Sequence, residues 1–101
     1  MQNIEHFVYL LKEALCLATH ELKLIHADKL SVWSAEQLSI VIIPEMSELL
    51  QYALKGKILH KYGKEQFLLE STYLMTDSLE QLSNSVLGKK LLEIQNLYNS
   101  L

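Results

Sequence analysis

A recurrence of apolar side chains near the N-terminus constrains this chain more than any other feature. One set repeats every seven residues, and a second set falls between successive members of the first. In chain order the members are Ile4, Val8, Leu11, Leu15, Ala18, Leu22 and Ile25. Because a helix turns about 100° per residue, this spacing gathers all of them on one stripe. The sequence therefore predicts a helix over residues 4–26.

A second apolar stripe lies beside the first on the same predicted helix. It consists of Leu10, Leu17 and Leu24 and, with Phe7 and Ala14, widens the apolar arc to about half the circumference. A helix that packs against one neighbour needs a narrower arc. We therefore expect this helix either to be central in the fold or to share an oligomer interface. The preferred interface is a homodimer in which Leu10, Leu17 and Leu24 contact the partner.

The next part of the chain predicts a connector, a short helix and a longer one. Residues 27–33 form the connector, and Ser34 with Gln37 three positions on is a capping-box pattern. Residues 35–43 are predicted to be helical, although their β-branched side chains also permit an extended strand. Pro44 is expected to stop or kink this element and to begin a helix that ends near Gly63. Gly56 either breaks that helix or permits close packing.

The C-terminal part predicts two further helices, over residues 64–82 and 85–99. Asp77 followed by Glu80 resembles a second helix start, so the first of them is open to interruption. The inner stripe of that helix is expected at Leu68, Thr72, Met75, Leu79 and Leu82. The predicted fold class is all-α: a small antiparallel bundle of four main helices plus one short helix, in one domain over residues 1–101.

Composition fixes the general class of protein. Half of the 101 residues are hydrophobic, which suffices for a single core. The densest apolar run, residues 38–43, is interrupted by Ser39 and falls far short of the about 20 residues that span a membrane. The first residues do not resemble a signal peptide, and the lone Cys16 cannot form an internal disulfide. We therefore expect a cytoplasmic protein without membrane contact.

Charge weighs against nucleic-acid binding. The formal net charge is −3, and all nine basic residues are lysines. Arginine is the preferred residue for bidentate contacts to phosphate and guanine, so its absence is informative. One local basic patch, at residues 55–64, keeps open the alternative of a weak DNA-associated regulator. Its lysines are Lys55, Lys57, Lys61 and Lys64.

Cys16 and His20 are the residues that come closest to a chemical site. They are four residues apart on the predicted first helix, and Glu13 projects from the same polar strip. Thiol, imidazole and carboxylate all bind metal ions, so these three are the candidate ligands. Zinc sites usually draw ligands from two elements, however, and no oxyanion hole or orienting acid accompanies the thiol. We therefore predict a solvated surface, no catalytic residue and no cofactor, and keep metal- or thiol-dependent activity as an alternative.

Two other groups of residues are candidates for recognition. The carboxylates of Glu65, Glu70, Asp77 and Glu80 are expected, together with those of Glu45 and Glu48, on a hydrated acidic face, with docking of a basic partner as the alternative. Trp33 lies in the connector beside Leu30 and Val32. We expect its ring to cover the end of the bundle, with the indole N–H bonded to a carbonyl. The alternative is an anchor for a partner, because Trp is enriched at binding hot spots.

These observations favour a non-enzymatic protein-interaction module whose partner is another protein, a second copy, or both. In size and charge the chain resembles bacterial immunity proteins and small phage or plasmid accessory proteins, with no motif in common. That resemblance implies an immunity-like, antitoxin-like or regulatory protein that occludes its target. A carrier with a small-ligand pocket inside the bundle is a further alternative.

Overall fold

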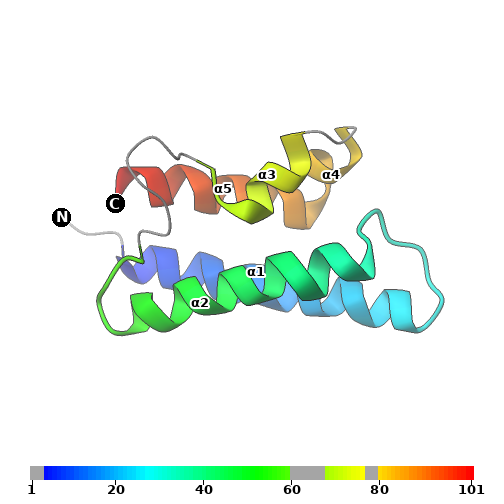
Figure 1. Ribbon diagram of the computed structural model, residues 1–101, viewed down its shortest axis with the longest axis horizontal. Helices are drawn as coiled ribbons and strands as arrows, with labels where there is room; N and C mark the ends of the chain where they lie inside the picture. The colour runs from blue at the N-terminus through cyan, green and yellow to red at the C-terminus, as the bar shows by residue number, and fades with distance from the viewer. Residues whose placement is uncertain (1–3, 60–67, 77–79) are drawn as a thin grey trace.

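The computed structural model describes residues 4–59, 68–76 and 80–101, and the described residues form a compact all-α fold, which confirms the predicted class (Figure 1). These residues form six helical segments in succession. They are α1 (Ile4–His26), η1 (Gln37–Ile42), α2 (Ile43–Leu54), α3 (Glu70–Thr76), α4 (Glu80–Asn84) and α5 (Val86–Ser100).

Helix α1 has the bounds that the apolar recurrence predicts. Glu5 in its first turn and Lys23 and His26 in its last turn complement the helix dipole. Asp28 ends it in the left-handed conformation, at φ 58°. The N–H of Lys29 then bonds to the carbonyl of Leu24 at 2.8 Å, and that of Asp28 to Ile25 at 3.0 Å. This pair of bonds is a Schellman motif, which satisfies carbonyls that the helix end leaves open.

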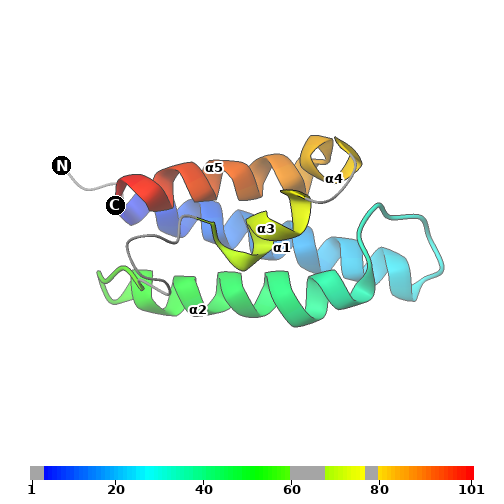
Figure 2. The same cartoon turned by 45° about the horizontal axis from the view of Figure 1, so that its top comes forward.

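Helix α1 is the central element of the fold. It packs against α2, α5 and η1, and in Figures 1 and 2 both α2 and α5 run back along it. Its buried residues are Phe7, Leu10, Leu11, Ala14 and Ala18. Contacts within the chain therefore account for the N-terminal part of the broad apolar arc. Towards the C-terminus the arc is only half covered, at Leu17, Leu22, Leu24 and Ile25.

Residues 35–43 are helical, and the extended alternative is wrong. The capping box forms reciprocally: the N–H of Gln37 donates to Ser34 Oγ at 3.0 Å, and the N–H of Ser34 to Gln37 Oε1 at 2.8 Å. The π-helix η1 follows, and it ends where the N–H of Ile43 bonds to the carbonyl of Leu38, five residues back.

Pro44 lies in the first turn of α2, as expected, and only the alternative of a full stop is wrong, because η1 continues directly into α2 (Figure 2). The hydrogen-bond ladder changes from the π to the α spacing at Ile43, and Pro44 is the next residue along. Proline has no N–H to contribute, and a change of spacing is a place where the missing donor costs little.

Gly56 breaks the next helix rather than lying inside it. Its φ of 75° is left-handed, and α2 ends at Leu54. The N–H of Lys57 bonds to Tyr52 at 3.0 Å and that of Gly56 to Ala53 at 2.9 Å, a second Schellman motif. The predicted end of this helix near Gly63 is therefore too late, and residue 63 itself lies outside the described residues.

The described part of the predicted 64–82 helix forms two short helices. Helix α3 lies between η1 and α5 and contacts both of them. Helix α4 leads directly into α5 (Figure 2). Of the predicted inner stripe Thr72, Met75 and Leu82 are buried and Leu68 is half-buried, while Leu79 lies outside the described residues. Ser85 caps α5 by accepting from the N–H of Gly88 at 3.0 Å.

No helix formed by the described residues combines the length and the apolar character needed to cross a bilayer.

Candidate functional site: an apolar hollow beside Trp33

Trp33 is held in place by the connector between α1 and η1. Ser31 Oγ donates to Glu21 Oε1 on α1 at 2.5 Å, and the backbone N–H of Trp33 donates to Ser31 Oγ at 3.1 Å. These bonds draw the connector against α1 and leave the Trp33 side chain only 3% exposed. The ring therefore covers the end of the core, as expected. The expected carbonyl partner is wrong, because Nε1 has no hydrogen-bond partner among the described residues.

A hollow of about 500 Å³ opens beside this ring, and we call it the Trp33 hollow. It is formed by the end of α1, the connector and the start of α5. Its lining residues are Glu21, Leu24, Leu30, Ser31, Val32, Trp33, Ser85, Val86 and Leu87. Three apolar members remain open to solvent: Leu30 is 97% exposed, Val86 69% and Val32 48%. Contiguous exposed apolar side chains with a polar rim are typical of a binding surface.

The four predicted partner-binding residues have different positions. Trp33 and Leu24 both line the Trp33 hollow, so the structure brings these two together. Leu17 is half-buried on α1, and Leu10 is 2% exposed inside the core.

Sequence reasoning missed Val86 and Ser85. They stand at the start of α5, far from the connector in sequence, and neither belongs to an apolar period. The sequence predicts only that a helix begins at residue 85, which indicates no binding role.

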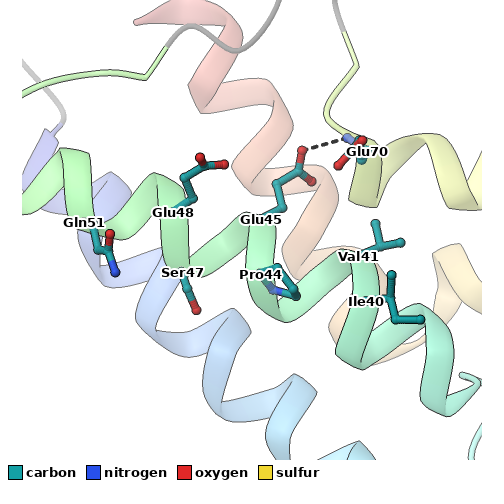
Figure 3. Close-up of a pocket in the computed structure, with 8 residues that line it drawn as sticks. All are labelled: Ile40, Val41, Pro44, Glu45, Ser47, Glu48, Gln51 and Glu70. Atoms are coloured by element: carbon teal, nitrogen blue, oxygen red, sulfur yellow. Dashed lines mark hydrogen bonds between the residues drawn. The ribbon is translucent and has the colours of Figure 1, made fainter.

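A second hollow of about 340 Å³ lies between α2 and α3 and includes three carboxylates (Figure 3). Its lining residues are Ile40, Val41, Pro44, Glu45, Ser47, Glu48, Gln51 and Glu70. The expectation of a hydrated acidic face is wrong for Glu45, which is 2% exposed, while Glu65 and Asp77 of that expected face lie outside the described residues. Glu45 Oε2 accepts from the N–H of Glu70 at 2.8 Å and its Oε1 from the N–H of Ser71 at 2.7 Å. The carboxylate caps α3 from a neighbouring helix, so its role is structural.

The polar strip of α1 keeps Cys16 and His20 on the surface, where both are exposed. They line a shallow hollow of about 480 Å³ with Lys12, Leu15, Thr19 and Lys23, all from α1. Among the described residues, no group of three or more His, Cys, Asp or Glu side chains could hold a metal ion.

Glu13, the third candidate ligand, forms an ion pair with α5. Lys90 Nζ lies 2.7 Å from Glu13 Oε1 and 3.3 Å from Glu93 Oε1. The hydrogen bond from Lys90 lowers the pKa of the Glu13 carboxyl, and a hydrogen bond from the Tyr9 hydroxyl adds to this effect. Reciprocally, the bond to Glu13 raises the pKa of Lys90. Glu13 thus links two helices.

The predicted basic patch is described in part. Lys55 and Lys57 are exposed at the end of α2, whereas Lys61 and Lys64 lie outside the described residues. With two of its four lysines placed, the patch adds no support for DNA binding.

Comparison with known proteins returned no family model, no curated protein and no solved structure that matches this chain.

Proposed function

We propose that this protein is a non-enzymatic interaction module whose protein partner binds over the Trp33 hollow. The observation that carries the proposal is the nearly complete exposure of Leu30 beside an apolar depression. A leucine in that position has solvent on almost every side, and its burial by a partner contributes about 1.5–3 kcal/mol.

The composition of the hollow supports the same proposal. Most of its lining residues are apolar, with Trp33 as the largest, and Glu21, Ser31 and Ser85 supply polar groups. Protein interfaces commonly combine an apolar centre, a buried aromatic anchor and a polar rim. Two residues selected from the sequence as partner contacts, Trp33 and Leu24, belong to this surface.

The proposed mechanism is occlusion. A module of this kind covers the active site or docking surface of its partner and needs no reactive group of its own. This is the mode of action expected of an immunity-like, antitoxin-like or regulatory protein, and we place it in the cytoplasm. A self-contact through α1, which the sequence also predicts, would draw on Leu17 and Leu24, since Leu10 is buried.

Matched surface variants test the proposal. Leu30→Ser and Val86→Ser remove apolar groups from the Trp33 hollow, and Leu54→Ser removes one that is 60% exposed elsewhere on the surface. Each tagged variant is used to isolate complexes from extracts of the source cells, and the dissociation constant is then measured with the purified partner. We expect Leu30→Ser and Val86→Ser to weaken binding at least about tenfold and Leu54→Ser to leave it unchanged.

Equal binding by all three variants would assign the partner to another surface and contradict the proposal. Self-association is measured in parallel, because a second copy is an admissible partner. If the protein formed no complex with itself or with another protein, the interaction function would be rejected as a whole.

A further inference from the structure

We propose that the partner at the Trp33 hollow is a second copy of this chain, with Leu30 of each copy inserted in the hollow of the other. This inference rests on the proposed function and names its partner.

The first argument is the position of Leu30 relative to the hollow. Leu30 is 97% exposed, and it belongs to the lining of the same depression as Trp33 and Leu24, which are buried and half-buried, respectively. A surface that carries a projection and a hollow side by side is complementary to itself under a two-fold rotation. In such an isologous contact each copy supplies both parts, and the two contacts form together.

The second argument is charge complementarity. Lys29 precedes the projecting leucine and is exposed, and Glu21 is the ionisable residue among those that line the hollow. Neither forms an ion pair with another residue in the described part of the chain. When Leu30 of one copy enters the hollow of the other, Lys29 is brought to the rim that carries Glu21. The same pair forms twice in the dimer.

The Glu21 carboxylate has capacity for this second contact. Its Oε1 accepts from Ser31 Oγ, which holds the connector. An ionised carboxylate has about four lone-pair sites on two oxygens, so an ammonium group can bind without displacing Ser31. The half-buried position of Glu21 also lessens the screening of the pair by salt.

Sedimentation equilibrium from about 1 µM to about 1 mM tests the dimer on the full chain. We expect the wild type to approach twice the mass of 11.6 kDa as the concentration rises. Leu30→Ser should raise the dissociation constant at least about tenfold, whereas Leu54→Ser, at an exposed position outside the hollow, should leave it within about twofold.

A charge reversal identifies the pair. Lys29→Glu alone and Glu21→Lys alone place like charges opposite each other in both contacts of a homodimer, so each variant should be monomeric. An equimolar mixture of the two should form a heterodimer, because one contact then keeps the native pair and the other joins the two substituted side chains, which have opposite charges. Trp33 is the chain's single Trp, so an emission spectrum equal to that of the wild type, compared at a concentration where both proteins are monomeric, shows that the hollow is intact in each variant. Leu30→Ser keeps the test decisive if Glu21→Lys fails to fold.

A wild-type protein that stays monomeric over the whole range would overturn the inference, as would a dimer that Leu30→Ser leaves unchanged. A monomer that binds a different protein through Leu30 and Val86 would reject the second copy and still uphold the interaction module. A monomer with no partner at this surface would reject both.

Discussion

The carboxylate of Glu45 shows how one residue links parts of the chain that are distant in sequence. It accepts the N–H groups of Glu70 and Ser71, and Gln95 Oε1 accepts the N–H of Leu69 at 2.7 Å. The N-terminal end of α3 is thus held by side chains from α2 and α5. From the sequence Glu45 is an acidic residue in the first turn of a helix, and no local pattern reveals that α3 returns to it.

Glu45→Ala should destabilise the fold by about 2–4 kcal/mol, because two backbone donors, one buried and one part-buried, lose a charged acceptor. Glu45→Gln should cost less, since one oxygen remains to accept. Urea unfolding followed by far-ultraviolet circular dichroism measures both. Glu36→Ala, the same loss of charge at a position outside the core, is the control and should change stability by less than about 0.5 kcal/mol. Equal effects at the two sites would contradict the capping role of Glu45.

Gly88→Ala should cost about 1–3 kcal/mol or more, because a Cβ at this position would overlap the carbonyl oxygen of Leu82. The obstructing atom belongs to the backbone, so α4 and α5 would have to separate. Gly56→Ala provides the comparison: a Cβ at Gly56 would meet no atom within 4 Å, so the cost arises from the left-handed φ alone, at about 1 kcal/mol. Thermal unfolding should rank Gly88→Ala as the more destabilising; the reverse order would argue against a tight α4–α5 junction.

At the scale of elements, the sequence predicts helices well where one apolar period runs without a competing signal. This holds for α1 and α5, whose predicted bounds agree with the structure to within a residue or so. It predicts poorly where two local signals compete. Pro44 predicts both a stop of the preceding helix and the start of the next one, and the chain continues through it where the π spacing of η1 ends. Gly56 is compatible both with a break in its helix and with close packing. Helix α3 depends on tertiary contacts, which no local pattern encodes.

The ion pair between α1 and α5 should make stability depend on pH. The pKa of Glu13 is lowered from 4.5 in the folded state, so its contribution is complete above that value and is lost as the pH falls through the lowered pKa. The pKa of Lys90 is raised from 10.5, so its contribution is complete below that value and is lost as the pH rises through the raised one. Glu13→Gln should therefore lower the melting temperature near pH 7 and lower it by less at a pH well below 4.5. A deficit of equal size at both pH values would show that the ion pair is not its cause.

At the scale of the whole molecule, the central place of α1 explains most of its broad apolar arc. The sequence leaves open whether the arc faces the rest of the chain or a second copy. The structure places Leu10 in the core and Leu24 at a hollow, a distinction that depends on where α5 begins. Trp33 and Leu24 could be selected from the sequence as partner contacts, Trp33 by its residue type and Leu24 by its place in the second apolar stripe. Val86 could not, because only the folded chain brings it to the connector.

Leu11→Ala should destabilise the molecule by about 2–5 kcal/mol, since Leu11 is fully buried on α1 and its loss leaves a cavity. Because α1 contacts α2, α5 and η1, we expect the denaturation midpoint to fall with no change in the slope. Leu17→Ala, on the same helix and half-buried, should cost clearly less. A biphasic unfolding curve for Leu11→Ala would mean that the helices unfold in separate units.

The connector that carries Leu30 is fixed at both ends and in the middle. A Schellman motif at Asp28 closes α1, the reciprocal capping box at Ser34 opens the next helix, and the bond from Ser31 to Glu21 secures the stretch between them. The connector backbone is therefore already ordered in the free protein, before a partner binds. Such preorganisation lowers the entropic cost of association, so a contact at Leu30 should give a higher affinity than the same contact made by a disordered segment.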